Sequence, residues 1–399
     1  MAVKFTKPEI NVREKLAELD KPSGIAGEAM LRAETTAEQQ ALIGVGRRNL
    51  LINGSMQVSQ RGTSFTSVSS GARHIDQYYF EKSGSWAGNI EQVSDGPGGT
   101  LTKSMKVTTT TPHTPGSSDY CQINHVVEGQ NLAHIGLGTA SCKPMTLSFW
   151  VKSSLTSTMS VQLSNNGTRT ISLQYNTVAG QWTYHSFLIP PITDGTWPGG
   201  NVRSLEFRWG MGYGSTWNGL ATSGQWKSTT GYAGFAAYAD NAMMSTDNAT
   251  WQISQIQLEV GKVATPFEHR SYGEELALCE RYYQKSYDKD AYVTGSTSLS
   301  SVGAVDHYGS SDATNVLAQV YFRTQMRDAP TVTTYDPNSS NGGNAYSGRA
   351  YINSNSGSAS YNTTTNNIGT TSFRSYVPRN GAAWAAHRLI FQWQADAEL

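Results

Sequence analysis

The residues best suited to chemistry are tryptophans in segments rich in turn-forming residues. Trp197, Trp217 and Trp226 lie among Gly, Pro, Asn and Ser, where a ring is more often exposed than on a strand. An exposed ring can stack on the apolar face of a pyranose while nearby amides and carboxylates bind its hydroxyls. We regard these three residues as candidate glycan ligands. The alternative is that they fill the ends of a β-sandwich or a seam between subunits, which is the commoner role of a single tryptophan.

A second candidate set lies in a polar stretch, residues 336–373, which is dominated by Asn, Ser, Thr and Gly. Its candidate ligand-binding residues are Tyr346, Arg349, Tyr351 and Tyr361. Rigid aromatic rings among small polar residues are typical of recognition loops, because such rings contact a ligand at low entropic cost. The stretch shows no clear strand periodicity, so we expect a long loop that is either a binding loop or a solvated linker.

Catalytic chemistry finds little support in the sequence. The eight histidines are dispersed, and Asp306 next to His307 would point to the opposite face of a strand. A glycan hydrolase needs two carboxylates about 5 to 9.5 Å apart, whereas acidic residues are sparse in the central region and no β-helix repeat is present. We therefore expect no enzyme activity and assign no catalytic residue.

Neither a metal site nor a cofactor site is expected. Asp240-Asn241 and Asp247-Asn248 flank two methionines, and such a loop could hold a hard cation, but an Asx-rich turn explains it more simply. Cys121, Cys142 and Cys279 are too scattered for a zinc site or a disulfide framework. We predict that they are small core residues.

The composition excludes several classes of protein. The chain has 399 residues, with 30 basic and 30 acidic side chains, so a nucleic-acid or membrane-surface partner is not expected. No apolar run approaches the ~18 residues of a membrane span, and residues 1–15 carry charges where a signal peptide would be apolar. We predict a globular protein that does not insert into a membrane.

Hydrophobic periodicity predicts a mainly β fold. Apolar residues alternate over 145–151, 171–175, 316–322 and 389–395, as expected for antiparallel strands with one wetted face. Over 251–260 the alternation slips between Ile253 and Ile256, which predicts a β-bulge. We predict a jelly-roll β-sandwich, then a linking helix and a second, smaller β-sandwich.

Three capping boxes mark the expected helices. Asn11 with Glu14, and Thr36 with Gln39, open two short helices that need a surface to dock against; a frayed terminal arm is the alternative. Ser271 with Glu274 opens a helix that should run to about Tyr287. The predicted domains are a helical N-terminal anchor (1–48), the jelly roll (49–268), the linking helix (269–288) and a C-terminal sandwich (289–399).

Several segments resemble bacteriophage proteins. Residues 49–62 (NLLINGSMQVSQRG) and 76–80 (DQYYF) are similar to the opening of a carbohydrate-binding-like jelly roll in many tail-fibre and tail-tip proteins. The other similar segments are the closing strand at 256–261 and 264–268, the connector at 272–283, the tip-domain string at 326–332, and 21–30, which resembles structural proteins of marine cyanophages.

This resemblance implies a homotrimeric tail fibre that is assembled in the host cytoplasm and located in the virion tail. Residues 1–48 would bind other virion proteins, and the C-terminal domain would contact host surface polysaccharide. The resemblance transfers no catalytic residue. A purely structural virion protein, such as a head fibre, decoration or tail-collar component, is the alternative, and a glycan hydrolase is a third.

Overall fold

The computed structural model describes residues 47–99, 102–165, 168–217, 224–228, 240–287, 307–309, 315–337, 347–354, 357–378 and 387–399. The chain divides into two compact units, Met1–Arg48 and Asn49–Leu399. Both predicted helices of the N-terminal anchor, and Tyr346, lie outside the described residues. The predicted role of residues 1–48 therefore stays a prediction.

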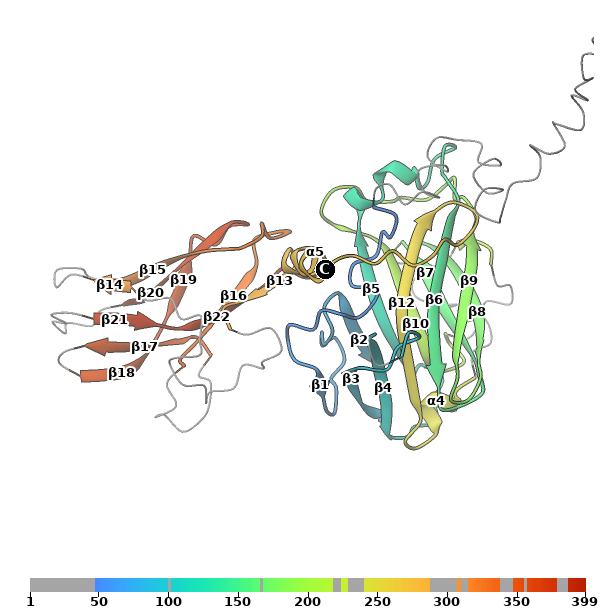
Figure 1. The fold of residues 1–399 in the computed structure, drawn as a ribbon, viewed down its shortest axis with the longest axis horizontal. Coiled ribbons are helices and arrows are strands. Elements are labelled where there is room, and N and C mark those ends of the chain that lie inside the picture. Colours follow the sequence, from blue (N-terminus) through green and yellow to red (C-terminus); the bar gives the residue numbers. More distant parts are fainter. Residues whose placement is uncertain are drawn as a thin grey trace, which may run out of the picture. The chain divides into compact units, whose positions relative to one another are not determined.

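Two six-stranded antiparallel sheets lie face to face and form the jelly roll (Figure 1). In spatial order, the first sheet holds β1 (Ser64–Phe65), β3 (Ala87–Val93), β4 (Ser104–Thr111), β12 (Thr250–Val260), β6 (Met145–Ser153) and β9 (Trp182–Ile189). The second sheet holds β11 (Lys227–Ser228), β8 (Arg169–Thr177), β7 (Ser157–Ser164), β10 (Arg203–Tyr213), β5 (Tyr120–Glu128) and β2 (Tyr78–Lys82). Among the described residues of the jelly roll, three short helices connect strands: η1 (Gly129–Asn131), η2 (Ala133–Ile135) and α4 (Ala242–Ser245).

The main core lies between these two sheets. Alternation along β6 and β10 turns Phe149 and Trp209 inward, where their rings meet at 90° with centroids 6.3 Å apart. The three cysteines are buried and form no disulfide, which confirms their prediction as core residues. Burial raises the pKa of Cys121 well above its usual value, so its thiol stays protonated.

The predicted bulge in β12 is confirmed. The pairing of β12 with β6 shifts register between Ser254 and Gln257, and Gln255 between them has φ 51°. The extra residue allows Ile253 and Ile256 to be buried on the same side of the strand, which strict alternation would forbid.

The linking helix is shorter than predicted. Helix α5 (Tyr272–Glu280) starts at the expected capping box of Ser271 and Glu274. The expectation that it runs to about Tyr287 is wrong, because Tyr283–Lys285 forms β13 and pairs with residues 394–396. Strand pairing there overrides the local helical pattern.

The C-terminal region forms three small antiparallel sheets around a second core. The first holds β13, β22 (Gln392–Asp396) and β16 (Thr331–Tyr335), and the second holds β14 (His307–Gly309), β21 (His387–Ile390), β17 (Arg349–Ser354) and β18 (Gly357–Asn362). The third holds β15 (Asn315–Tyr321), β20 (Ser372–Pro378) and β19 (Thr364–Asn366).

The expected long loop at 336–373 is wrong for the described part of that stretch. β17 and β18 form an antiparallel hairpin, and β19 follows it. Ala350 and Ile352 of β17 are buried in the second core. Only two apolar residues on the inward face, among many polar ones, leave an alternation too weak to detect in the sequence.

A partly buried ion network joins the jelly roll to the C-terminal strands within the second unit. Arg61 contacts Asp396 at 3.0 Å and Glu398 at 2.8 Å, and its guanidinium lies 3.7 Å from the Tyr283 ring centroid. Arg73 contacts the other oxygen of Glu398 at 2.8 Å.

Candidate functional site

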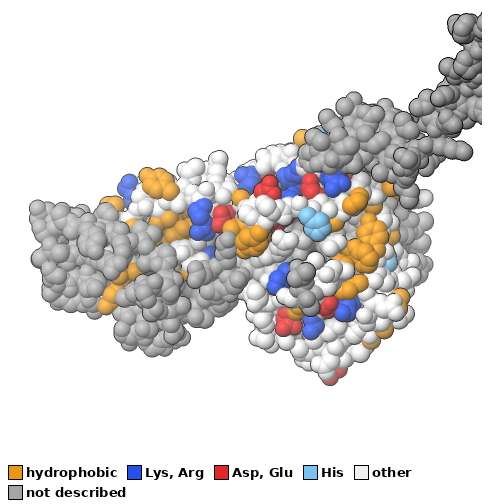
Figure 2. All heavy atoms as spheres, viewed as in Figure 1, with side chains coloured by type: hydrophobic (Ala, Val, Ile, Leu, Met, Phe, Trp, Pro, Cys, Tyr) orange, Lys and Arg blue, Asp and Glu red, His pale blue; other side chains and the backbone are white. Residues whose placement is uncertain are grey.

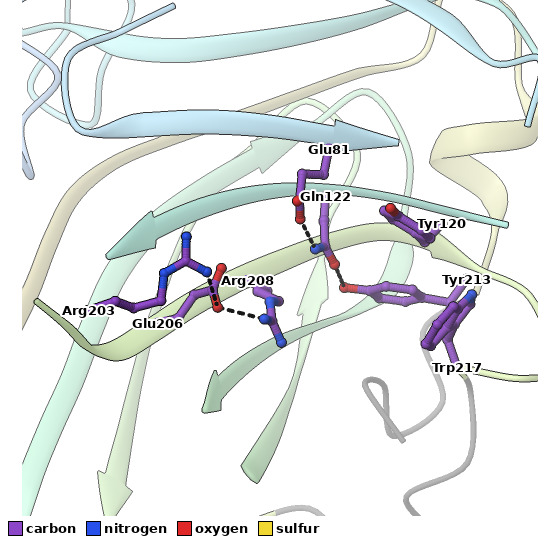
Figure 3. A pocket seen from close by; sticks show the side chains of 8 residues that line it. All are labelled: Glu81, Tyr120, Gln122, Arg203, Glu206, Arg208, Tyr213 and Trp217. Atoms are coloured by element: carbon purple, nitrogen blue, oxygen red, sulfur yellow. Dashed lines mark hydrogen bonds and ion pairs between the residues drawn. The ribbon is translucent and has the colours of Figure 1, made fainter. Parts of the chain in front are cut away.

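A pocket of about 200 Å³ opens on the outer face of the second jelly-roll sheet. Figure 3 shows its lining residues, which are Glu81, Tyr120, Gln122, Arg203, Glu206, Arg208, Tyr213 and Trp217. We call it the outer cleft. It arises from the alternation of β10, in which Phe207 and Trp209 face the core while Glu206 and Arg208 take the opposite face.

Strand register aligns a row of polar residues across this face. Tyr79 pairs with Asn124, Asn124 with Arg208, Arg208 with Gln162, and Gln162 with Ser172. The row crosses β2, β5, β10, β7 and β8 and spans roughly 19 Å at ~4.8 Å per strand. All five side chains are at most 6% exposed, and of them only Arg208 lines the outer cleft, so the row is a buried polar layer next to the cleft and not a surface that a ligand contacts.

A buried ion pair fixes one end of the outer cleft. Glu206 and Arg208 are 1% and 3% exposed, and Glu206 Oε2 accepts from Arg208 Nη2 at 2.6 Å and from Arg203 Nη1 at 3.4 Å. Tyr79 donates its hydroxyl to Glu206 Oε1. Burial and the neighbouring Glu206 carboxylate raise the pKa of Tyr79, so the phenol remains a donor. Glu206 is therefore a carboxylate acceptor surrounded by donors.

Amide side chains continue the network toward the middle of the outer cleft. Glu81 Oε2 accepts from Gln122 Nε2 at 2.9 Å and from Asn124 Nδ2 at 3.0 Å. Tyr213 donates its hydroxyl to Gln122 Oε1 at 2.9 Å. Each amide is thereby held in one orientation, which makes the polar surface rigid.

Aromatic rings form the other end. Tyr120 and Trp217 meet edge to face with centroids 5.8 Å apart, and Trp217 Nε1 donates to the Ser118 carbonyl at 2.7 Å. Figure 3 shows these rings and Tyr213 gathered at one end, with Arg203 and Glu206 at the other. Ring faces beside fixed hydrogen-bonding groups are the features that hold a sugar ring.

The outer cleft includes one of the predicted ligand residues, Trp217. Trp197 and Trp226 instead stack edge to face on each other at 5.6 Å and pack against the main core. Their indole nitrogens donate to the carbonyls of Asp194 and Pro190. These contacts match the packing alternative for these two tryptophans.

The C-terminal candidates lie on strands and do not line the outer cleft. Arg349 donates to the hydroxyl and the carbonyl of Ser360 across the β17–β18 hairpin, at 3.0 Å each. Tyr351 is half-buried on β17, and Tyr361 packs partly against the second core. Their role as glycan ligands stays a prediction.

Sequence reasoning missed the polar lining. Its signal was present in β10, where Arg203, Glu206 and Arg208 stand among apolar residues of a strand. Charged side chains inside an apolar strand are costly unless they are paired. That pattern indicates that these charges are paired on one face of the sheet, but the sequence alone does not show which strands lie next to β10.

The structure also brings Ser85, His113 and Asp119, which are not adjacent in the sequence, within hydrogen-bonding distance of one another. Ser85 Oγ lies 2.9 Å from His113 Nδ1, and His113 Nε2 lies 2.7 Å from Asp119 Oδ2. The hydrogen bonds from His113 and from the Gly116 amide lower the pKa of Asp119. In hydrolase triads the serine meets Nε2 and the aspartate Nδ1, whereas here the ring is turned the other way. The cluster connects the β2–β3 turn to the segment before β5.

Within the described residues, no group of three or more His, Cys, Asp or Glu side chains could hold a metal ion. Asp240 instead accepts from Ser157 Oγ and from the amides of Thr158 and Ala242, as an Asx turn does. No helix in the described part of the chain is long and apolar enough to span a membrane.

Comparison with known proteins yields only solved structures. No protein-family model and no curated protein matches the chain. A structure described as "CBM4 structure and function" is 13% identical and covers 53% of this chain and 99% of its own, with a TM-score of 0.28. A family 11 carbohydrate-binding module of a Clostridium thermocellum cellulosomal cellulase is 12% identical, with coverages of 50% and 100% and a TM-score of 0.26.

A third similar structure is the enzymatically active domain of bacteriophage CBA120 tailspike protein 4. It is 11% identical with a TM-score of 0.26, and the match covers 49% of this chain and 22% of that one.

Proposed function

We propose that this chain binds glycans in the outer cleft of its jelly roll. The observation that carries the proposal is the outer cleft itself, where a cluster of three aromatic rings adjoins a rigid row of carboxylate, amide and guanidinium groups. Sugar rings present an apolar face and a rim of hydroxyls, and such a surface matches both.

The biological setting is proposed from the sequence. The segments at 49–62, 256–268 and 326–332 resemble phage tail-fibre proteins, which supports a virion appendage that attaches the particle to host surface polysaccharide. In this proposal the chain is a homotrimer and residues 1–48 bind other virion proteins. A purely structural virion protein is the alternative, and it predicts that the outer cleft binds no glycan.

One observation favours hydrolysis as a second candidate, since the carboxylates of Glu81 and Glu206 line the same cleft. A glycosidase needs one of its two carboxyl groups to donate a proton. Both carboxylates instead act as acceptors in the contacts observed, Glu206 from Tyr79, Arg203 and Arg208 and Glu81 from the amides of Gln122 and Asn124, and neither donates a proton. The contacts therefore support binding without cleavage.

The test uses the full-length chain and purified host envelope polysaccharide. We expect the protein to deplete the polysaccharide from solution without shortening it, and Trp217→Ala to weaken binding by about tenfold, equivalent to about 1.4 kcal/mol. Trp226→Ala is the matched control, because it removes another half-buried tryptophan that donates to a carbonyl. Shortening of the polysaccharide would support hydrolysis, and no depletion would support the structural alternative.

A further inference from the structure

We propose that the outer cleft selects uncharged glycans and rejects anionic ones that carry uronate, phosphate or sulfate groups. This inference rests on the proposed function and names the ligand class of the same site. It follows from a balance of charges at the outer cleft and from how those charges are already engaged.

The lining carries two carboxylates and two guanidinium groups, from Glu81, Glu206, Arg203 and Arg208. Their formal charges cancel. The innermost pair, Glu206 and Arg208, is almost completely buried and joined at 2.6 Å. The second terminal nitrogen of Arg208 donates to Gln162 Oε1 at 3.1 Å, so both terminal nitrogens of this cation are bound within the protein.

The charges nearer to solvent also balance. The Arg203 side chain is 31% exposed, and Glu81 is half-buried at the middle of the outer cleft. A carboxylate on the ligand would gain from Arg203 but would also meet the negative charge of Glu81. The repulsion from Glu81 would offset the gain from Arg203, so the cost of desolvating the ligand carboxylate would not be recovered.

Strands β7 and β8 add no charge beside the outer cleft, and Glu128 of β5, which pairs across the strands with Arg203, is buried and forms an ion pair with Arg281 at 3.1 Å. The outward residues of β7 and β8 in the same rows are uncharged, namely Ser160, Gln162, Ser164, Thr170 and Ser172. The sequence between Tyr213 and Asp240 holds a single charged residue, Lys227, which lies on the edge strand β11. On the face that Figure 2 draws, the Lys and Arg side chains in colour are interspersed with Asp and Glu side chains.

An uncharged glycan avoids the desolvation cost of a charge. Its hydroxyls can both donate and accept, and the outer cleft offers carboxylate acceptors beside guanidinium and amide donors. Binding should then depend little on ionic strength, because no net charge is neutralised.

The experiment uses the full-length chain and an anionic host polysaccharide fraction, isolated by anion exchange, together with its carboxyl-reduced form. Reduction converts each uronate carboxylate to a hydroxymethyl group and keeps the linkage, so the two ligands differ only at that group and in its charge. We expect calorimetry to show about tenfold tighter binding of the reduced form, as one unit charge in a partly screened site implies.

Two variants probe the charge balance from opposite sides. Glu81→Gln should narrow the difference between the two ligands to less than threefold, and Arg203→Gln should widen it beyond tenfold. Arg203 is partly exposed, so that variant remains informative if Glu81→Gln fails to fold by circular dichroism.

The outcomes separate this inference from the proposed function. Equal or tighter binding of the unreduced, anionic form would overturn the charge selectivity and leave glycan binding intact. If neither form binds, the proposed function is wrong and the selectivity falls with it.

Discussion

At the scale of single residues, the outer cleft holds a buried ion pair whose members depend on each other. Glu206 and Arg208 are both less than 4% exposed, so removing one partner leaves the other charge buried without its main compensation. We expect Arg208→Met to lower the free energy of unfolding by about 3–5 kcal/mol. Arg203→Met is the control, because its partly exposed pair with Glu206 should contribute no more than about 1 kcal/mol. Urea unfolding of both variants measures the difference, and equal midpoints would contradict it.

Two buried histidines should make stability depend on pH. Burial lowers the pKa of His74 and of His125 from 6.5 to about 4, although His125 Nε2 lies 3.1 Å from the Ile52 carbonyl oxygen. Between these values the unfolded chain binds protons that the folded protein excludes, so stability is complete above pH 6.5 and decreases as the pH falls toward 4. The loss is about 3 kcal/mol for each histidine.

The pH dependence can be assigned with single variants. Chemical unfolding measured between pH 7 and pH 4.5 should show a smaller decrease in stability for His125→Gln than for the unmodified protein. His134→Gln changes an exposed histidine and should leave the decrease as it was. If His125→Gln keeps the full decrease, the buried imidazole is not its source.

At the scale of elements, helix α5 holds the chain where the jelly roll ends. Its capping box uses Ser271 and Glu274, and Glu275 on its first turn accepts from the Asn53 amide and from Arg270. We expect Ser271→Ala to lower the unfolding free energy by about 1 kcal/mol, measured by thermal unfolding. Ser245→Ala changes an exposed serine at the end of α4 and should have a smaller effect. Equal losses would argue against the cap.

How far the elements could be predicted depended on the strength of each hydrophobic pattern. The strands predicted from long alternating runs, such as β6 and the interrupted run of β12, were correct, because their inward residues fill a large core. The β17–β18 hairpin was missed because its inward face is short and its outward face is polar. Of the outer cleft, only Trp217 was predicted, since Glu81 and Gln122 are 41 positions apart in the sequence and Arg208 is farther still, and strand pairing brings them together.

At the scale of the whole described chain, the motif at 49–62 has a structural role that its resemblance alone did not show. Asn53 Nδ2 donates to the carbonyls of Val58 and Asp76, and Gln60 Nε2 donates to Asp76 and to the Tyr283 carbonyl. Arg61 then meets the C-terminal strand through Asp396 and Glu398. The start of the jelly roll therefore supplies one set of contacts that join it to the C-terminal sheets.

We expect the contacts of Arg61 to make the jelly roll and the C-terminal sheets unfold together. Burial opposes the charge of Arg61, but the carboxylates of Glu398 and Asp396 raise its pKa above the usual value. Arg61→Met would leave Glu398, whose side chain is 2% exposed, with Arg73 as its remaining ion-pair partner among the described residues.

We expect the region 49–399 to unfold in one calorimetric transition, and Arg61→Met to split this transition into two. Arg169→Met, which removes an ion pair with the exposed Asp194, should leave the number of transitions unchanged. A single transition in Arg61→Met at an unchanged temperature would show that the C-terminal sheets are coupled to the jelly roll by other contacts, such as that of Arg327 with Asn201.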